Sequence, residues 1–371
     1  MLRIGFVGWR GMVGSVLMGQ MMDEHDFMGF EPTFFTTSNV GGKGPDVGLE
    51  IPPLKDAYEI DLLSPLDIIV TCQGGGYTKK VYPELKKSGW NGYWIDSAST
   101  LRLDDNSIIV LDPVNRSVID LGLSSGIKTF VGGNCTVSLM LMALSGLFAA
   151  GHIKWISPMT YQAASGAGAK NMKELIAQMS VLANASKDLL DDPASSAIAI
   201  DEIVTKEMRS SSFPDTHFLA PLAGSLLPWI DSGMDSGQTR EEWKGSVETN
   251  KILQTDEQIP IDGLCVRVGA MRCHSQGFTI KLDRDLPLDE VAEMIENGNR
   301  WVRLVPNDKE STLRHLTPAA VNGTLTIPVG RLRKMLIGPE YVAAFTVGDQ
   351  LLWGAAEPIR RILNIIIERL S

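Results

Sequence analysis

The sequence predicts an α/β protein with a doubly wound parallel sheet first and an α+β second domain after it. Over the first 133 of its 371 residues, short and almost wholly apolar runs alternate with helical stretches. Such runs are typical of parallel strands that are covered on both faces. After Gly133 the strands alternate in polarity and the helices are longer. We therefore expect domains at 1–133 and 134–348, and a final helix at 349–371 that packs on the first domain.

The first domain opens with an apolar run, Leu2–Val7, that ends at a glycine, and a helix is expected at Met12–Met22. Later strands should each be short, apolar or β-branched, and closed by Gly, Ser, Pro or Asp. They are Thr33–Thr37, Asp67–Cys72, Gly92–Asp96, Ile108–Leu111 and Thr129–Val131. The Gly- and Pro-rich stretch Val40–Pro53 predicts a surface loop.

The second domain begins with an apolar helix from Cys135 to about Ala150. Further helices are expected at Ala167–Ala185, Asp192–Ser212, Thr239–Leu253 and Leu286–Asn297. Thr239 and Glu242 form a capping box at the start of one of them. Strands are expected at Ser157–Ala163, Gly263–Ala270, Arg272–Leu282, Thr324–Leu332 and Tyr341–Val347. The last element, Gln350–Leu370, has the pattern of an amphipathic helix.

Composition and charge exclude several classes of protein. With 34 basic and 44 acidic residues, the net charge of -10 gives no field that would attract nucleic acid or an anionic membrane. None of the four cysteines forms a C-x-x-C pair, so the chain has no zinc-ribbon spacing and we expect no metal. The apolar stretch Val137–Ala150 falls short of the roughly 20 residues of a membrane span. We expect a cytoplasmic protein without a signal peptide.

A glycine-rich turn joins the first strand to the first helix. Its sequence, Gly8-Trp9-Arg10-Gly11-Met12-Val13-Gly14, lets the backbone approach a pyrophosphate at a helix N-terminus. This position favours a Rossmann-like dinucleotide site. The second strand ends in Phe35-Thr36-Thr37-Ser38-Asn39, without the acid that usually holds the ribose of NAD. A 2′-phosphate could pair there with Arg10, so NADP is favoured.

A candidate nucleophile lies where another strand meets a helix, in Gly132-Gly133-Asn134-Cys135-Thr136. The positive end of the helix dipole predicts a Cys135 thiol that is ionised near neutral pH. Free N–H groups at this helix start could also hold an oxyanion. The cysteines Cys72, Cys265 and Cys273 lie in strand-like runs and are interpreted as buried small hydrophobes.

A thiolate beside a nicotinamide indicates a particular chemistry. Its sulfur adds to an aldehyde, the thiohemiacetal gives a hydride to the cofactor, and a thioester remains for a second nucleophile. Residue types alone leave the base open among five histidines. They are His25, His152, His217, His274 and His315.

Five motifs, in order, closely resemble the bacterial aspartate-β-semialdehyde dehydrogenases of the Gram-negative branch. They are the glycine turn, the Cys135 segment with Val137-Ser138, Tyr161 to Gly168, Glu241-Glu242-Trp243-Lys244, and Arg267 to Ser275. The resemblance runs from residue 1 to the last helix. It implies NADPH-dependent reductive dephosphorylation of L-4-aspartyl phosphate to the semialdehyde, in lysine, threonine, methionine and diaminopimelate synthesis. It also implies a homodimer formed through the second domain.

The resemblance implies Cys135 as the acyl-bearing nucleophile and His274 as general acid/base. The other implied substrate contacts are Gln162 for the acyl group, Arg267 for the α-carboxylate, Glu241 for the amino group, and Arg102 and Lys244 for phosphate. The implied NADP contacts are Gly8, Arg10, Gly11, Met12, Val13, Thr37, Ser38, Gln73, Ser165, Gly166, Ala167, Gly168, Ala169, Pro193 and Gln350.

Three alternatives remain open on the residues. An N-acetyl-glutamyl-phosphate reductase would use the same cysteine chemistry, but an acid such as Glu241 suits a free ammonium and not an acetamide. A cofactor-free Cys–His acyl transferase would have no use for the glycine turn at Gly8, and a failed NADPH titration would favour it. A non-enzymic dinucleotide sensor would need no reactive thiol, so labelling of Cys135 by iodoacetamide would count against it.

Overall fold

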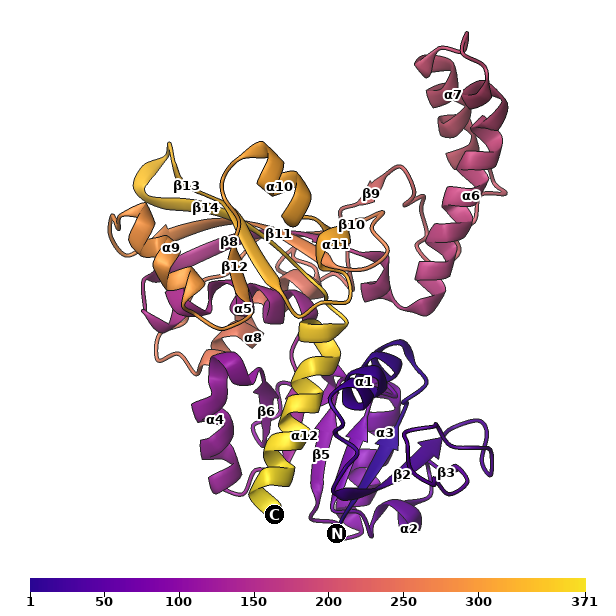
Figure 1. Cartoon of the computed structure of the whole chain (residues 1–371), viewed down its shortest axis with the longest axis vertical. Helices are drawn as coiled ribbons and strands as arrows, with labels where there is room; N and C mark the ends of the chain where they lie inside the picture. The colour runs from indigo at the N-terminus through magenta and orange to yellow at the C-terminus, as the bar shows by residue number, and fades with distance from the viewer.

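The computed structural model describes residues 1–371 and contains two seven-stranded sheets (Figure 1). The strands of the first are β1 (Leu2–Val7), β2 (Phe30–Thr36), β3 (Lys55–Asp56), β4 (Ile68–Thr71), β5 (Tyr93–Asp96), β6 (Ser107–Val110) and β7 (Thr129–Gly132). All of its pairs are parallel and the order is β3-β2-β1-β4-β5-β7-β6. The predicted doubly wound parallel sheet is therefore confirmed, and its order reverses between β1 and β4.

Helices in the first part of the chain cover this sheet. They are α1 (Met12–Asp23), α2 (Ile60–Leu63), α3 (Gly75–Lys87) and α4 (Asp112–Ser124). The sequence pattern predicted α1 but not α3 or α4. Successive glycines at the start of α3 and Pro83 inside it are poor helix formers, so local preference hides this helix. Packing against the sheet overrides that preference, because Tyr77, Val81 and Leu85 of α3 are buried.

The second sheet contains parallel and antiparallel pairs, and the predicted α+β character of this part of the chain is confirmed. Its strands are β8 (Ile153–Gln162), β9 (Leu226–Leu227), β10 (Leu264–Val268), β11 (His274–Leu282), β12 (Val302–Leu304), β13 (Ile327–Met335) and β14 (Gly338–Gly348). Their order is β12-β13-β14-β11-β8-β10-β9. The helices here are α5 (Cys135–Ala149), α6 (Ala169–Asp191), α7 (Ala197–Met208), α8 (Arg240–Leu253), α9 (Leu288–Glu296), α10 (Lys309–His315) and α11 (Pro318–Val321). Helices α6 and α7 project away from the body (Figure 1).

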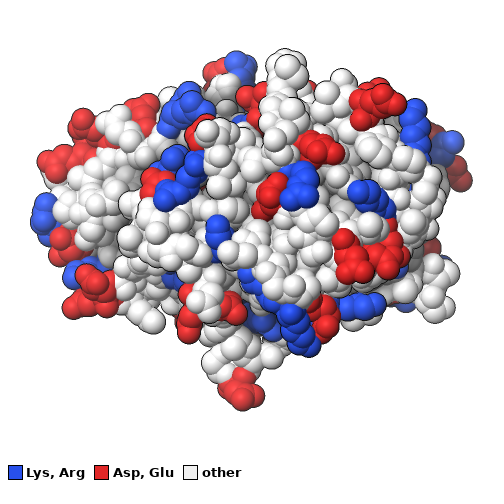
Figure 2. All heavy atoms as spheres, turned by 90° about the horizontal axis from the view of Figure 1, so that it is seen from below, with Lys and Arg blue, Asp and Glu red and all other residues white.

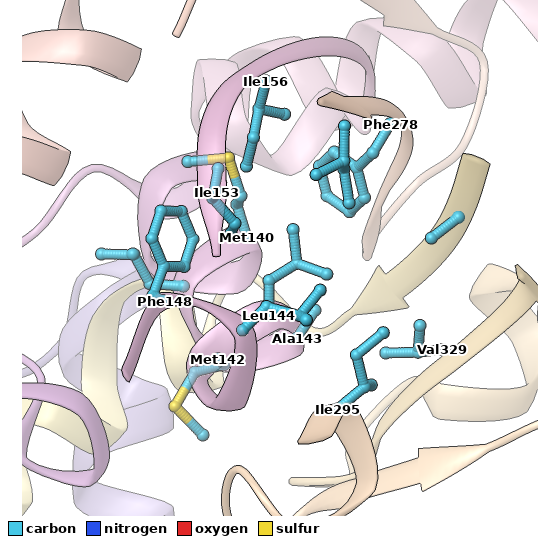
Figure 3. Packing of buried hydrophobic residues seen from close by; sticks show 14 of the residues in the cluster. Met140, Met142, Ala143, Leu144, Phe148, Ile153, Ile156, Phe278, Ile295 and Val329 are labelled. Atoms are coloured by element: carbon cyan, nitrogen blue, oxygen red, sulfur yellow. The ribbon is translucent and has the colours of Figure 1, made fainter. Parts of the chain in front are cut away.

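Helix α5 forms the centre of the largest hydrophobic core. Met140, Met142 and Leu144 lie with Ile156 and Phe278 of the second sheet in one buried cluster (Figure 3). The helix is apolar on all sides, which is the pattern of a helix enclosed by other elements. Because its first residue is Cys135, this packing fixes where the candidate nucleophile lies.

The last helix, α12 (Glu357–Leu370), follows a π-helical turn, Leu352–Ala356. It runs from the second sheet down along the first, and both chain ends lie at the same end of the molecule (Figure 1). Ile359, Ile362, Leu363 and Ile366 are buried with side chains of the first sheet. Arg361 also pairs with Asp112 of α4 at 2.6 Å.

Two surface properties complete the description. No helix has both the length and the apolar character needed to span a bilayer. Acidic and basic side chains are interspersed over the end of the molecule that carries the first sheet (Figure 2).

Candidate active site

The glycine turn brings β1 and β4 into close contact at the point where the strand order reverses. Gly8 has a φ of +75°, and a Cβ there would lie 2.4 Å from the Gln73 nitrogen. A Cβ on Gly14 would lie 2.2 Å from the Gly8 oxygen. Gly11 caps α1 without a side-chain bond, so the first N–H groups of the helix are left for a ligand. This backbone cradle fits a dinucleotide pyrophosphate.

The end of β2 carries hydroxyl groups and one arginine. The Arg10 guanidinium donates to Thr36 Oγ1 at 2.9 Å and to Ser38 Oγ at 3.4 Å. The Gln73 amide donates to Thr37 Oγ1 at 3.5 Å. The structure thus brings together predicted contacts from three separate segments. A cation among hydroxyls and amides suits a phosphate on the ribose of a dinucleotide.

A cleft of about 560 Å³ begins beside α1 and reaches α5 and α8. It joins the glycine turn to the Cys135 segment. The predicted site residues that line it are Met12, Val13, Arg102, Cys135, Gln162, Ser165, Gly166, Ala167, Gly168, Glu241, Lys244, Arg267 and Gln350. Residues separated by more than 300 positions in the chain therefore face one space.

Cys135 is the first residue of α5, as predicted. The helix is capped by Asn134, whose Oδ1 accepts from the backbone nitrogens of Thr136 at 3.0 Å and Val137 at 3.2 Å. On its other side Cys135 meets the π-helical turn, since a Cβ on Gly354 would lie 2.7 Å from the Cys135 Cβ. The absence of a side chain at Gly354 gives the nucleophile its room.

The acidity of the Cys135 thiol differs from the sequence-based expectation. Burial, and next the Glu241 carboxylate, raise its pKa to about 12. The cations Arg267, Arg102 and Lys244 pull the pKa down but do not outweigh burial. Burial of the sulfur therefore opposes the ionised thiol that the helix start favours, although the Cys135 side chain keeps some exposure in the cleft.

Helix α8 presents polar side chains to the cleft. Glu241 Oε1 accepts from Asn134 Nδ2 at 2.9 Å and from Gln162 Nε2 at 3.3 Å. Its other oxygen accepts from Lys244 Nζ at 3.0 Å, and Lys244 also pairs with Asp231 at 2.8 Å. The predicted capping box is confirmed at the start of α8 and holds this first turn in place.

Arg102 is buried beneath the cysteine segment. Its guanidinium donates to the carbonyl oxygens of Gly132 at 2.6 Å and Gly133 at 2.9 Å, and to Glu248 at 3.1 Å. The other Glu248 oxygen accepts from the backbone nitrogen of Asn134 at 2.7 Å. Because a guanidinium has five N–H groups, Arg102 keeps donors for a ligand in the cleft.

Arg267 and His274 meet at the backbone of Ala163. Arg267 donates to the Ala163 oxygen at 2.8 Å, and the Ala163 nitrogen donates to His274 Nδ1 at 3.0 Å. A Cβ on Gly166 would lie 2.8 Å from Arg267 Nη1 and 3.0 Å from His274 Nε2. Burial, and then the positive charge of Arg267, hold the pKa of His274 well below its ordinary value.

Gln350 lies just before the π-helical turn and bonds to Cys273, the residue that precedes His274. Its side-chain oxygen accepts from the Cys273 nitrogen at 2.7 Å, and its amide donates to Ser165. Cys273 has a φ of +76° and precedes β11, so it belongs to a turn and not to a strand as expected. The expectation that Cys265 and Cys273 are buried is confirmed, whereas Cys72 is partly exposed.

Several predicted residues do not line the cleft, among them His274, which is fully buried. Ala169 starts α6 just beyond the cleft, and Pro193 follows α6 on the projecting pair of helices, outside the cleft. Sequence reasoning also missed some polar groups. Asn134 had a signal as the cap of an apolar helix, and Glu248 lies seven residues beyond Glu241 on one helix face. Asp231 comes from an irregular segment, and no local pattern marks it.

The chain matches family models over most of its length. Residues 3–121 match the NAD binding domain of semialdehyde dehydrogenase, and residues 144–353 match its dimerisation domain. An aspartate semialdehyde dehydrogenase from Francisella tularensis is 49% identical, with a TM-score of 0.94 over 99% of this chain and 100% of that one.

Two more distant structures share the fold. Aspartate semialdehyde dehydrogenase II from Vibrio cholerae, complexed with ASA, is 24% identical with a TM-score of 0.79 over 99% of this chain and 98% of that one. The Candida albicans enzyme with NADP is 16% identical with a TM-score of 0.65 over 100% and 98%. By the family models and the Francisella match, the chain belongs to the semialdehyde dehydrogenase family, among the aspartate semialdehyde dehydrogenases.

Proposed function

We propose that this protein carries out the reaction of its family, the NADPH-dependent reductive dephosphorylation of L-4-aspartyl phosphate to L-aspartate 4-semialdehyde, through a thioester on Cys135. One observation carries the proposal. Cys135 faces the same cleft as a carboxylate and several cations, and that cleft continues to a dinucleotide cradle. The reverse, phosphate-dependent oxidation of the semialdehyde uses the same groups.

The polar groups of the cleft match the charges of the substrate. Arg267 offers a fork of donors to the α-carboxylate, and Glu241 offers an acceptor to the ammonium group. Gln162, hydrogen-bonded to Glu241, lies at the end of β8 and supports the acyl group. Arg102 and Lys244 provide positive charge for the phosphoryl group in a protein that is acidic overall.

In the first step the Cys135 sulfur attacks the β-carbonyl carbon of aspartyl phosphate. A C–S bond forms, the C–O bond to phosphorus breaks, and the phosphate leaves with that electron pair. His274, as the general acid/base, takes the thiol proton and passes it to the departing phosphate oxygen, so that the products are the thioester and hydrogen phosphate. Because burial raises the pKa of the Cys135 thiol, a group that accepts its proton is needed as the sulfur attacks.

The second step needs a reductant. NADPH supplies, when bound, the hydride that reduces the thioester carbonyl carbon. Gly8, Gly11 and the first turn of α1 would hold its pyrophosphate, and Arg10 with Ser38 would hold its 2′-phosphate. Breaking the C–S bond then releases the aldehyde, and the Cys135 sulfur recovers its electron pair and a proton from solvent.

A spectrophotometric assay tests this function directly. Aspartate semialdehyde, NADP and inorganic phosphate should together give NADPH at a rate that depends on phosphate. Cys135→Ala should lower the rate by at least about a thousandfold, because no sulfur remains to carry the acyl group. A rate within tenfold of the wild type would contradict the proposal.

The same assay addresses the nearest alternative. An N-acetyl-glutamyl-phosphate reductase would act on a substrate whose amine is acylated, and the buried Glu241 carboxylate would then face an uncharged amide. Replacing aspartate semialdehyde by N-acetyl-glutamate semialdehyde should therefore give little NADPH. The cleft favours the substrate with the free ammonium group.

We further propose a homodimer and the domain division at 133/134 and 348/349. The match of residues 144–353 to a dimerisation domain supports an interface formed by the second part of the chain. The two separate sheets and the packing of α12 support the division. Sedimentation of the purified protein at micromolar concentration should give twice the mass of 40.4 kDa.

A further inference from the structure

Asp231 places a second carboxylate on the lysine that is proposed to bind phosphate. It lines the cleft together with Lys244 and Glu241. Lys244 Nζ donates to Asp231 Oδ2 at 2.8 Å and to Glu241 Oε2 at 3.0 Å. An ammonium group has three N–H donors, so the two carboxylates take two of them and one remains for a phosphate oxygen.

The position of the Asp231 carboxylate is fixed by its own segment. Asp231 has a φ of +71°, a left-handed conformation that few residues except Gly, Asn and Asp adopt. Its backbone oxygen accepts from Trp229 Nε1 at 2.9 Å, and its Oδ1 accepts from the Ser232 nitrogen at 2.8 Å. The Arg240 nitrogen donates to the Ser232 oxygen at 2.7 Å, which ties the segment to the first turn of α8. Asp231 is therefore held in place against the helix that carries Lys244.

The charges around Lys244 do not balance. Burial lowers the pKa of Lys244, but the contacts with Glu241 and Asp231 outweigh burial and hold this pKa above its ordinary value. Burial raises the pKa of Asp231, but the hydrogen bonds from Lys244 and Ser232 outweigh it and hold this pKa below its ordinary value. At neutral pH one ammonium group therefore lies between two carboxylates.

A negative charge at this position affects free phosphate more than the acyl phosphate substrate. Two acceptors on one tetrahedral ammonium nitrogen lie roughly 4.5 Å apart, so a phosphate oxygen on the remaining N–H would face the Asp231 carboxylate. Like charges at that distance repel each other. The substrate is also held through its α-carboxylate and its ammonium group, whereas inorganic phosphate has no such contacts. The repulsion therefore removes the larger share of the binding from free phosphate.

We propose that Asp231 weakens the binding of inorganic phosphate at Lys244, so that phosphate leaves readily after acylation and must be abundant for the reverse reaction. This inference rests on the proposed function, since it concerns the product of the same acylation step. Asp231 acts on phosphate across Lys244 and takes no part in bond making. A carboxylate that only supported the fold of its segment would leave the phosphate affinity unchanged.

Calorimetric titration of inorganic phosphate into the enzyme with bound NADP measures this affinity without turnover. Asp231→Asn removes the charge, tolerates the left-handed backbone and keeps an acceptor for the Ser232 nitrogen. We expect its Kd for phosphate to be about tenfold below that of the wild type, a limited gain because 35% of the Asp231 side chain is exposed and solvent screens part of the repulsion. An equal or higher Kd would overturn the proposal.

Three further variants make the titration decisive. Asp235→Asn, at an exposed acid in the same segment, is the matched control and should leave the Kd unchanged. Asp231→Gly also suits the backbone and should lower the Kd, so the test does not depend on one variant that folds. Lys244→Ala should raise the Kd. An unchanged Kd in Lys244→Ala would mean that phosphate binds elsewhere, and this too would contradict the proposal.

Steady-state kinetics separates an effect on phosphate from a structural effect. In the phosphate-dependent oxidation of aspartate semialdehyde, Asp231→Asn should lower KM for phosphate by the same factor as the Kd, and KM for the semialdehyde should not change. A loss of kcat with an unchanged KM for phosphate would show that Asp231 only supports the fold of the site.

The outcomes distinguish this inference from the proposed function. A wild-type enzyme that forms no NADPH from aspartate semialdehyde, NADP and phosphate would contradict the function, and the titrations would still decide the effect of Asp231 on phosphate. An active enzyme whose Kd for phosphate is the same in the wild type and in Asp231→Asn would keep the function and overturn the inference.

Discussion

Gly166 is where the backbone comes nearest to both Arg267 and His274. An added Cβ would lie 2.8 Å from Arg267 Nη1 and 3.0 Å from His274 Nε2, and both of these side chains are buried. The neighbours cannot yield without breaking their bonds to Ala163. A single methyl group at this position should therefore disturb Arg267 and His274 together.

We expect Gly166→Ala to lower kcat/KM for aspartate semialdehyde by roughly 100-fold, as a misplacement of about 1 Å does at active sites. The unfolding midpoint should change little, because the contact is local. Gly19→Ala, in α1 where an added Cβ meets nothing within 4 Å, is the control and should keep full activity. Equal activity of the two variants would mean that Gly166 does not pack against the catalytic groups as described.

Arg10 provides a second prediction at this scale. Its bonds to Thr36 and Ser38 place a cation beside hydroxyls at the end of β2. Arg10→Ala should raise KM for NADPH by about 10- to 100-fold, since a charge-assisted hydrogen bond contributes about 1.5–3 kcal/mol. KM for NADH should not change, because NADH has no 2′-phosphate. Lys43→Ala, in the neighbouring surface loop, is the control, and a parallel rise for both cofactors would contradict the assignment.

The sequence predicted the position of Cys135 in the fold better than the surroundings of its thiol. Cys135 could be found because glycines and a helix start are local features of the chain. Its raised pKa could not be predicted, because burial and the charge of Glu241 raise it, and both Glu241 and the π-helical turn that packs on Cys135 come from distant segments. The hydrogen bond from the Ala163 nitrogen to His274 likewise joins residues that are 111 positions apart.

At the scale of elements, α8 organises one side of the site. Glu241, Lys244 and Glu248 follow one another at spacings of three and four, so one helix face meets the cleft, the cysteine segment and Arg102. The first turn is fixed by the capping box, in which Thr239 accepts from the Glu242 nitrogen and Glu242 accepts from the Thr239 nitrogen. Stability and substrate binding are therefore coupled at the start of this helix.

Thr239→Ala should lower the free energy of unfolding by about 1 kcal/mol, the usual cost of losing a helix cap. It should also raise KM for aspartate semialdehyde several-fold, because Glu241 and Lys244 lie in the first turns of α8. Thr239→Ser keeps the hydroxyl and should restore both values. Denaturant unfolding measures the change in stability, and steady-state kinetics measures KM. A loss of stability with unchanged KM would show that the helix cap does not affect substrate binding.

A helix could be predicted where its own residues favour helix or mark its start. It could not be predicted where contacts with distant segments determine the backbone. The apolar residues of α5 and the capping box of α8 gave clear signals. The end of the chain was expected as one helix, but it contains a π-helical turn at Leu352–Ala356 before α12. Contact with Cys135 at Gly354 shapes this turn, and no local preference of the segment encodes that contact.

On the scale of the whole molecule, α12 packs the end of the chain against the first sheet, which is formed by residues near its beginning. The chain leaves the second sheet at Gly348, and α12 then packs beside the strands of the first. Its ion pairs bind Arg360 to Asp26 at 2.8 Å and Arg361 to Asp112 at 2.6 Å. The hydrophobic core against the first sheet therefore includes residues from the end of the chain, and residues 1–133 alone lack part of this core.

Removal of residues 357–371 should unfold the first domain. Ile359, Ile362, Leu363 and Ile366 are each no more than 1% exposed, and burial of such a side chain contributes about 1.5–3 kcal/mol. Together they contribute about as much as the 5–15 kcal/mol that stabilises a typical protein. Nucleotide affinity and the protection of β1 and β4 from hydrogen exchange should both be lost.

A graded series separates packing from simple truncation. Ile362→Val should cost about 0.5–1.5 kcal/mol and Ile362→Ala about 2–5 kcal/mol, because the cavity in the core of the first sheet grows with each carbon removed. Glu368→Ala, on the exposed side of α12, should stay within about 0.5 kcal/mol of the wild type. Calorimetry would measure each loss of stability as a lower unfolding temperature of the first domain. The unfolding transition of that domain is the one whose temperature rises when NADP is added, because a ligand stabilises the part of the molecule that binds it. If that transition stayed in place while another moved, α12 would belong energetically to the second sheet, and the proposed division of the chain at 348/349 would be wrong.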